Sequence, residues 1–351
     1  MTKKTNTTCP NCGSSMRYSP SKEGLYCKNC QYHQEIEAKE ITLKKPFDFN
    51  QKEILAEDLF GKQSVNLHCP NCGANVISNE LEFAGVCPYC DTALVNSSGK
   101  TFTPPDSIIP FKFEKEEASK IFAEKMRKKL FAPTKFKRHL PIDKIKALYI
   151  PCFLFDAETQ TDYTATIEIE EEHTDSNGNT HTYTRYEHVR GHIDLSHKNV
   201  LVEASSHIDQ KDIDKIKAYD FSKLREFKKE FVLGYTVEQN DTSAEKCKKI
   251  AQNMIKNRIS NAISKKYSYG KVTNLRMNTD YIDERMSFSI LPTYIADYEF
   301  KEKKYRTMMN GQTGKVGGKY PKSGLKITSF VLSIIGGIGL IILLILLATK
   351  R

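Results

Sequence analysis

The sequence lacks the signatures that would assign it to an enzyme or to a secreted protein. Its first 13 residues, MTKKTNTTCPNCG, contain no apolar segment, so we expect no secretory signal there. The stretch Asn310–Val316 resembles a phosphate-binding loop, but it lacks the first glycine, and Val316 stands where the Ser or Thr that holds magnesium should be. Cys152 lies among apolar residues, Cys247 lies on the apolar face of a predicted helix, and neither carries a nucleophile signature. We therefore predict no catalytic residue and no enzymatic activity.

Acidic residues are almost absent from the last fifty residues, and this absence locates the net charge of the chain. The whole chain has a formal net charge of +10. Residues 1–100 hold 11 Lys and Arg against 11 Asp and Glu, whereas residues 301–351 hold 10 Lys and Arg against Glu302 alone. A protein that binds a phosphate backbone should carry its excess of base on the binding domain. The distribution therefore favours a membrane surface over nucleic acid as the partner of the basic residues.

A long apolar run lies near the C-terminus. Ile327–Ala348 contains no charged residue, and a helix of this length spans roughly 33 Å, enough for a hydrocarbon core of about 30 Å. The strongly basic segment Lys301–Lys326 precedes it, and only Lys350 and Arg351 follow. The positive-inside rule then predicts a single-pass cell-membrane protein with a cytoplasmic body and an outer C-terminus. A glycolipid-anchor signal is a poorer match, because no uncharged polar spacer is present.

Two kinds of membrane contact follow from this segment. The basic flank should add attraction to anionic headgroups, so we expect membrane lipids as partners of the helix and its flank. Ser329, Ser333 and Gly337 recur every four residues beside Gly336, a stripe of small residues that lets two helices approach closely. A homodimer through this stripe is one prediction, and ordinary use of Ser and Gly in a membrane helix is the alternative.

Eight of the ten cysteines form four CxxC pairs with regular spacing. The pairs are Cys9 and Cys12, Cys27 and Cys30, Cys69 and Cys72, and Cys87 and Cys90. Within each set of four, 14 residues separate the pairs, and the two sets lie 60 residues apart as an internal repeat. Two CxxC pairs in a short segment suit a tetrahedral zinc site with four cysteine ligands. Disulfides would need an oxidising compartment, and a redox CxxC is normally a single motif. We therefore predict two zinc ribbons, each with one structural Zn²⁺ ion.

The residues around the cysteines refine this prediction. Gly13 and Gly73 follow the first pair of each ribbon, where the chain needs positive φ, whereas Gln31 and Asp91 stand at the same place after the second pairs. Four thiolates fill the coordination sphere, so the zinc should be structural. Their charge also makes the ribbons acidic, which favours protein partners and makes nucleic acid unlikely. His33 and His68 are predicted to be surface histidines.

The middle of the chain predicts a mixed α+β domain. Glu116–Phe131, Asp212–Phe231 and Ser243–Ile263 place apolar residues on one helical face and predict core-packing helices. Ile150–Asp156 (IPCFLFD) parallels Leu291–Asp297 (LPTYIAD), and each follows an amphipathic helix. The similarity predicts a duplicated α/β-hairpin domain on one sheet, with coincidence as the alternative. Asn310-Gly311 is expected to form a hairpin turn.

A histidine-rich β-hairpin is predicted between the two halves. Thr164–Glu170 and His181–Asp194 alternate in polarity and flank the turn Asn177-Gly178. Five histidines lie in this region near a run of glutamates, but their spacing matches no metal ligand set, and exposed strand histidines are the simpler interpretation.

The predicted fold class is α+β: two N-terminal zinc ribbons, a duplicated α/β-hairpin domain with a β-hairpin insertion, and one C-terminal transmembrane helix. The predicted boundaries are zinc ribbon 1 at 1–40, a linker at 41–63, zinc ribbon 2 at 64–98, the duplicated domain at 99–310 (halves about 107–165 and 232–310), a basic juxtamembrane linker at 311–326 and the transmembrane helix at 327–348.

The CPNCG ribbons, the LPTY segment, the NGQTGKVGG turn and the C-terminal apolar helix together resemble a family of uncharacterised bacterial proteins described as containing TFIIB-type zinc ribbons. The resemblance implies a function alongside phage-shock and flotillin-like membrane-stress systems. Some relatives carry a primosomal-helicase-like label, which the missing nucleotide-binding loop contradicts. We expect a non-enzymatic, membrane-anchored adaptor that recruits protein partners. The alternative is a membrane-tethered nucleic-acid-binding or transcription-related zinc-ribbon protein.

Overall fold

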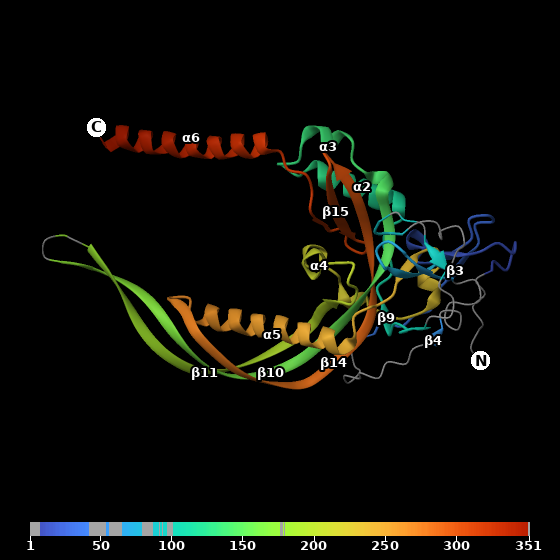
Figure 1. Ribbon diagram of the computed structural model, residues 1–351, viewed down its shortest axis with the longest axis horizontal. Helices are drawn as coiled ribbons and strands as arrows, with labels where there is room; N and C mark the ends of the chain where they lie inside the picture. Colours follow the sequence, from blue (N-terminus) through green and yellow to red (C-terminus); the bar gives the residue numbers. More distant parts are fainter. Residues whose placement is uncertain are drawn as a thin grey trace.

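The structure is a computed structural model, and it describes residues 8–41, 54–55, 65–78, 87–90, 92, 94–96, 101–175, 178 and 180–349. It has a mixed α/β architecture with two four-cysteine clusters near the N-terminus and an apolar C-terminal helix that stands apart from the rest (Figure 1).

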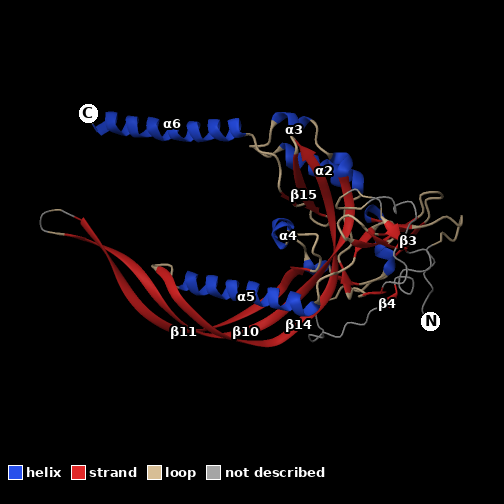
Figure 2. Ribbon diagram, viewed as in Figure 1, coloured by secondary structure: helices blue, strands red, loops and turns tan. Residues whose placement is uncertain are grey.

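Three unusually long antiparallel strands dominate the fold: β10 (Ile145–Thr174), β11 (Thr180–Glu203) and β14 (Lys271–Phe300), with β10 in the middle. Their inner ends are buried in the body of the protein. Their outer parts (157–174, 180–198 and 271–284), which we call the arm, curve away from the body (Figure 2). The predicted turn at Asn177-Gly178 falls at the tip. Asn177 lies outside the described residues, and Gly178 has the positive φ of 82° expected of a turn glycine.

Three β-bulges account for the curvature of the arm. The pairing register of β10 shifts beside Ala157 on both of its edges and again beside Ala165. At each shift the partner strand has one extra residue in the left-handed region, namely Asn199 (φ 50°), Asp283 (φ 52°) and Asn274 (φ 49°). Asn and Asp tolerate this conformation better than other non-glycine residues, and a bulge bends its strand.

Helix α5 (Ala244–Lys266) lies along the inner side of this curve. The Ser243 hydroxyl caps its N-terminus by accepting a hydrogen bond from the Lys246 amide at 3.4 Å. Six residues on one face are buried against the three long strands: Ala244, Cys247, Ala251, Ile255, Ile259 and Ile263. Burying an isoleucine contributes about 1.5–3 kcal/mol, so this stripe holds the base of the arm together. The predicted helix Ser243–Ile263 is therefore present and extends three residues further.

The body surrounds the inner halves of β10 and β14. Its short elements are η3 (Ile142–Lys144), β9 (Ser107–Ile108), β12 (Arg225–Glu226), β13 (Thr236–Glu238), β15 (Lys303–Asn310), β16 (Val316–Gly318), α2 (Lys115–Arg127), α3 (Thr134–Arg138), α4 (Gln210–Ile216), η4 (Phe221–Lys223), η5 (Lys229–Val232) and the small pair β4 (Ile54–Leu55) with β8 (Thr101–Phe102). Alternate residues of β10 face opposite layers. Tyr149 packs with the cluster of α2 and α3, and Leu148 packs with that of α4.

Two of the three predicted helices are shorter than expected. α2 ends at Arg127, so Leu130, predicted on its buried face, is instead 61% exposed. The predicted helix Asp212–Phe231 is wrong beyond Ile216, where α4 ends. The Asp220 carboxylate accepts hydrogen bonds from the amide and hydroxyl of Ser222, which begins a 3-10 turn in place of a continued helix. Phe221 and Leu224 still pack against the core from this irregular chain.

The two similar segments meet in the centre of the sheet. Ile150 pairs with Leu291, and Pro151 pairs with Ile290. Each proline stands where its strand changes neighbours: β10 leaves β13 after Tyr149 and joins β11 at Cys152, and β14 leaves β9 after Ile290 and joins β15 at Thr293. A residue without an amide proton is tolerated in mid-strand at such a gap. The duplication itself stays a prediction.

The end of the chain differs from the predicted linker 311–326. Residues 316–318 form β16, which pairs with β15, so part of this segment belongs to the sheet. The predicted turn at Asn310 connects these strands through a longer loop, in which the Asn310 side chain accepts hydrogen bonds from the amides of Gln312 and Thr313.

Helix α6 (Gly324–Thr349) follows, three residues earlier than predicted. The Ser323 hydroxyl caps it by accepting from the Lys326 amide at 3.4 Å. Within Gly324–Ala348, the most apolar window of 18 residues has a mean hydropathy of 3.0 and is not buried, and this is the one helix in the described part of the chain long and apolar enough to cross a membrane. The helix and the arm extend from the same side of the body (Figure 1).

Candidate metal centres

The structure gathers eight cysteines into two groups of four. Cys9, Cys12, Cys27 and Cys30 form the first group, and Cys69, Cys72, Cys87 and Cys90 form the second. Within each group all sulfur atoms lie within 4.8 Å of one another, and within the described residues these are the groups of three or more potential ligands that could hold a metal ion. Both clusters are suited to metal binding and consistent with zinc.

The sulfur spacing fits a tetrahedral ion. In the first group the Sγ atoms of Cys9 and Cys30 are 3.4 Å apart, and those of Cys12 and Cys27 are 3.5 Å apart. The matching distances in the second group are 3.4 and 3.6 Å. A zinc ion with Zn–S bonds of about 2.3 Å would separate its sulfurs by about 3.8 Å. A small adjustment of side chains therefore admits one Zn²⁺ per group, with no position left for a substrate.

Three of the four CxxC knuckles are closed by a backbone hydrogen bond to the carbonyl of their first cysteine. The Gly13 amide donates to the Cys9 carbonyl at 2.9 Å, and the Gln31 amide donates to the Cys27 carbonyl at 2.9 Å. Gly13 and Gly73 have φ values of 72° and 81°. Gln31 has φ of 63°, so a residue with a side chain adopts the conformation that the knuckle requires. Asp91, at the fourth such place, lies outside the described residues.

Local hydrogen bonds favour the thiolate form of Cys12 in the first group, whereas the pKa of Cys30 in the same group is raised. The side chain and the backbone of Ser14, together with Asn29, lower the pKa of Cys12 to about 5. Metal ions bind the thiolate and not the thiol, so this environment assists loading. By contrast, burial raises the pKa of Cys247 to about 12, consistent with the inert role expected of that residue.

The first ribbon forms a small sheet of its own, β1 (Arg17–Ser19), β2 (Gly24–Tyr26) and β3 (His33–Glu35), with η1 (Pro20–Lys22) between β1 and β2. It contacts the body through the buried Tyr18, which belongs to the core cluster of α2 and α3, and through hydrogen bonds: the Tyr18 amide donates to the Leu233 carbonyl at 3.0 Å, and the Ser19 hydroxyl donates to Glu114 at 2.6 Å. A cavity of about 620 Å³ remains between this ribbon, the second ribbon and the start of α2.

The second ribbon is integrated into the main sheet. Its strands β5 (Val65–His68), β6 (Asn75–Ser78) and β7 (Val95–Asn96) continue the sheet of the body, because β6 pairs with β13. The body also donates hydrogen bonds to its knuckles. Lys146 donates to the Cys87 carbonyl at 2.9 Å, and His207 Nε2 donates to the Cys72 carbonyl at 2.9 Å.

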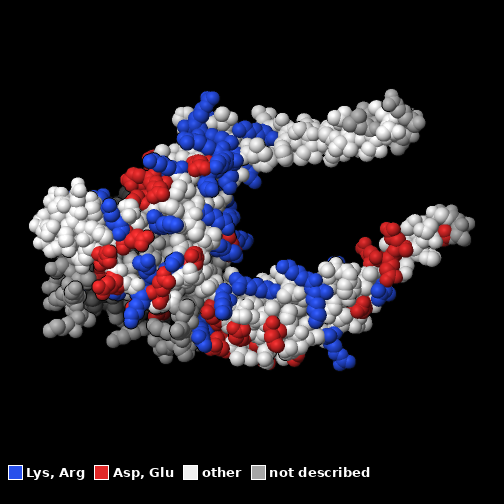
Figure 3. Space-filling model, turned by 180° about the vertical axis from the view of Figure 1, so that it is seen from behind, with Lys and Arg blue, Asp and Glu red and all other residues white. Residues whose placement is uncertain are grey.

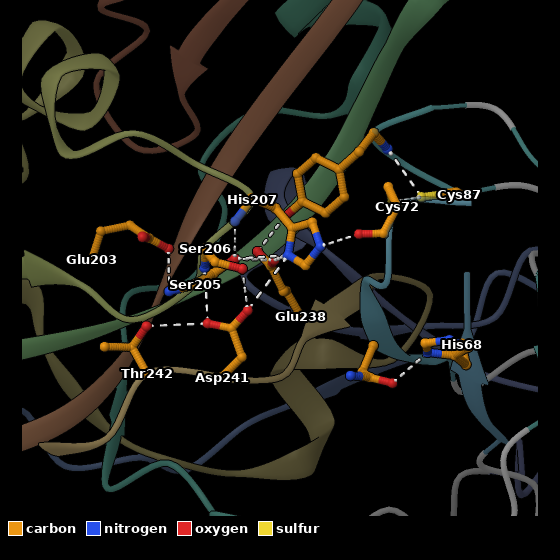
Figure 4. Close-up of polar contacts among 12 residues, drawn as sticks. His68, Cys72, Cys87, Glu203, Ser205, Ser206, His207, Glu238, Asp241 and Thr242 are labelled. Atoms are coloured by element: carbon orange, nitrogen blue, oxygen red, sulfur yellow. Dashed lines mark hydrogen bonds and ion pairs between the residues drawn. The ribbon is translucent and has the colours of Figure 1, made fainter. Parts of the chain in front are cut away.

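A buried polar network surrounds His207 (Figure 4). Glu238 accepts short hydrogen bonds from the Tyr89 and Ser205 hydroxyls, and its carboxylate lies 3.4 Å from His207 Nδ1. Hydrogen bonding to Glu238 raises the pKa of His207. The Tyr89 ring stacks on His207 with centroids 5.2 Å apart. The network joins the second ribbon to the body.

Arg306 completes this junction from β15. Its guanidinium lies over the Tyr89 ring at 5.2 Å, forms two hydrogen bonds to Asp297 at 2.8 and 2.9 Å, and donates to the His207 carbonyl at 2.6 Å. No sequence motif marks His207, Glu238 or Arg306 as part of this junction. The sequence does contain one hint of the junction: the second ribbon has Tyr89 where the first ribbon has Asn29. A tyrosine buried at this position needs a hydrogen-bond partner for its hydroxyl.

The predicted exposure of the histidines is confirmed only in part, since His197 on β11 is buried at 3% exposure. His33 is exposed, whereas His68 is half-buried and bonds Asn75 at 3.0 Å. On the arm, His192 lies between Asp162 and Asp194 at 2.6 and 2.9 Å, and hydrogen bonds to these carboxylates raise its pKa.

The chain is similar in sequence to a protein of Bacillus subtilis. The chain is 27% identical over 338 residues, 94% of each chain, to the uncharacterized protein YdjG of Bacillus subtilis (strain 168). No family model matches the sequence, and no solved structure matches it. The similarity covers nearly the whole length of both chains.

Proposed function

We propose that the protein is a non-enzymatic adaptor, anchored by α6 in the cell membrane with its body in the cytoplasm, which carries two structural Zn²⁺ ions and recruits protein partners. The fold and the four-cysteine clusters support the zinc assignment, and the basic flank of α6 supports the orientation. The resemblance to zinc-ribbon proteins of phage-shock and flotillin-like systems suggests membrane stress as the setting. Pro151 and Pro292 stand at the same place in the two similar segments, which supports the duplicated domain.

The observation that carries the proposal is the arm. Its strands extend well past the hydrophobic core, and the described residues 180–186 of β11 are all exposed. Tyr183 and Tyr186 remain 51% and 61% exposed there. Beyond Ile167 no residue of β10 is buried, so the outer end of the arm adds little buried apolar area and its contribution to stability does not explain it. Exposed aromatic residues on a rigid scaffold are typical of protein-binding surfaces.

A crosslinked pull-down from membranes tests the proposal. Full-length protein with Tyr183→Ser and Tyr186→Ser should lose the proteins that the wild type retains. The matched control is Tyr269→Ser, a 55% exposed tyrosine near the end of α5. A variant without the first ribbon should show which partners depend on it. An identical set of partners for wild type and the double variant would refute the arm as the recruiting surface.

The alternative is nucleic-acid binding, and one observation favours it. Helix α5 carries seven Lys and Arg against Glu245 alone, and most of them are exposed. Basic side chains lie along the part of the arm nearer the body, on the side that faces α6, whereas acidic side chains gather nearer the tip (Figure 3). Binding of this kind should weaken steeply with salt. The alternative predicts salt-dependent retention of labelled DNA or RNA that Lys256→Glu with Arg258→Glu abolishes, whereas the adaptor proposal predicts no retention.

A further inference from the structure

We propose that the corner between α2 and α3, residues 125–138, is a second membrane contact that binds the headgroups of anionic phospholipids beside the point where α6 enters the bilayer. The inference rests on the proposed anchoring of α6, and it assigns a lipid-binding role to a segment far from α6 in the sequence.

The corner is strongly basic. Its sequence, KMRKKLFAPTKFKR, holds seven Lys and Arg and no acidic residue. Most of these side chains are exposed. Lys128 pairs with Glu124, an exposed residue one turn earlier, and among the described residues the other six form no ion pair. The local charge is therefore not neutralised by the protein and is available to an anionic partner.

The fold places this charge at the base of α6. The Phe131 carbonyl accepts a hydrogen bond from the Ser323 amide at 2.8 Å, and the Ala132 carbonyl accepts one from Lys326 at 2.9 Å. The Phe131 ring meets the Phe330 ring with centroids 5.4 Å apart. A dense group of Lys and Arg lies at this point in Figure 3. Since Ser323 caps the apolar helix, the corner stays close to the membrane entry point.

Exposed apolar side chains accompany the charge. Leu130 is 61% exposed in the middle of the basic corner, and Leu325 is 86% exposed in the first turn of α6. An isolated exposed leucine is ordinary, but a leucine between lysines next to a membrane-spanning helix matches an interfacial anchor. The lysines can keep their ammonium groups among headgroups while the leucine enters the acyl boundary. This combination favours lipid over an acidic protein as the occupant.

The absence of tryptophan from the chain allows a direct test. Full-length Leu130→Trp would be reconstituted into vesicles of phosphatidylcholine alone or mixed with phosphatidylglycerol, each with acyl chains brominated or not. The tryptophan emission should shift to shorter wavelength and be quenched by brominated lipid in the mixed vesicles, and much less in phosphatidylcholine alone. Tyr269→Trp, at the end of α5, is the matched control and should show neither effect.

Charge reversal tests whether the basic residues are needed to bring the residue at position 130 to the lipid. Lys135→Glu, Lys137→Glu and Arg138→Glu added to Leu130→Trp should remove most of the quenching, while the protein still floats with the vesicles because α6 is unchanged. Equal quenching in both lipid mixtures, quenching that survives charge reversal, or equal quenching of both tryptophans would each overturn the proposal. A protein that does not float after alkaline extraction would instead contradict the anchoring of α6.

Discussion

Glu203 is a buried carboxyl group whose protonation state matters for stability. It is 7% exposed, and one of its oxygens accepts a hydrogen bond from the Ser205 amide at 2.6 Å. Burial, reinforced by the charge of Glu238, raises the pKa of Glu203 to about 10. The group is therefore neutral at physiological pH, and a glutamine could replace it without changing the charge of the network.

This leads to a pH-dependent prediction. An unfolded glutamate has a pKa of about 4.3, so the folded state holds a proton that the unfolded state has released between about pH 4 and about pH 10. The free energy of unfolding should then fall as pH rises through this window, by up to about 1.4 kcal/mol per pH unit. Glu203→Gln has no proton to lose. Thermal unfolding of detergent-solubilised protein should show wild type losing more stability than Glu203→Gln toward high pH, and parallel curves would contradict the assignment.

Metal content gives a second prediction for single residues. Purified full-length protein should contain two zinc ions per chain, because two sets of four cysteines have tetrahedral spacing. Cys12→Ser removes one ligand of the first group and should leave one ion, since incomplete ligation weakens binding and the ribbon folds with its metal. Cys247→Ala, a buried cysteine outside both groups, should leave both ions in place. Elemental analysis of the wild type and of the two variants checks the prediction. One zinc ion or none in the wild type would contradict it.

The sequence could predict the cysteine groups but not the network that attaches the second one. CxxC pairs are local, so their spacing alone indicates which sulfurs can meet. The bond between Tyr89 and Glu238 joins residues 149 positions apart, and His207 reaches Cys72 across 135 positions. Such contacts depend on how β6 and β13 align in the sheet, which no local pattern specifies.

The bulges of the arm give a prediction at the level of strands. Asn274 and Asn278 are both exposed on β14, but Asn274 has φ of 49° at a bulge, whereas Asn278 pairs with Asp162 in regular register. Valine strongly disfavours the left-handed region. Asn274→Val should destabilise the protein by roughly 1–2 kcal/mol, whereas Asn278→Val should be neutral or slightly stabilising.

Hydrogen exchange of the arm in the full-length variants checks this prediction. Faster exchange should appear in β14 and in its partner β10 for Asn274→Val alone. If both variants exchanged like the wild type, the left-handed residue would not be what shapes the arm.

The sequence predicted the extent of some helices and strands correctly and that of others incorrectly. Helix α5 was predicted over nearly its whole length because its apolar stripe is continuous and Ser243 marks its start. The predicted helix beyond Ile216 failed because Asp220 bonds its own local backbone. The full length of β10 was not anticipated. Its inner half is apolar on both faces and its outer half alternates, so the pattern indicated two separate segments in place of one strand.

The orientation of the whole molecule is open to a topological test. An epitope inserted at Gly178, in the turn at the tip of the arm, should be tolerated, because exposed turns accept insertions. A second epitope would follow Arg351. In intact spheroplasts, external protease should remove the C-terminal epitope and spare the one at the tip. The opposite pattern would place the body outside the cell and would contradict the positive-inside argument.

The common direction of α6 and the arm constrains how the protein can sit in a bilayer. A bilayer built around α6 in this direction would also enclose the arm, whose outer strands carry Glu168, Glu170, Arg185 and Arg190. Hydrocarbon excludes charged side chains and open sheet edges. For α6 to span the membrane, the chain must turn near Gly324, where no neighbouring atom lies within 4 Å of a Cβ position. The bond between the Ser323 amide and the Phe131 carbonyl precedes that turn and can persist, whereas the contacts of Lys326 and Phe330 with the corner follow it and would be lost.

After such a turn the arm would lie alongside the membrane instead of pointing through it. A strand of 30 residues has a contour length of about 100 Å at about 3.3 Å per residue. A molecule fixed at α6 and rotating about the membrane normal would then sample a wide disc just beneath the lipid surface. It could meet other membrane-bound proteins at distances that a compact domain of the same mass cannot cover, and its search for them would be two-dimensional.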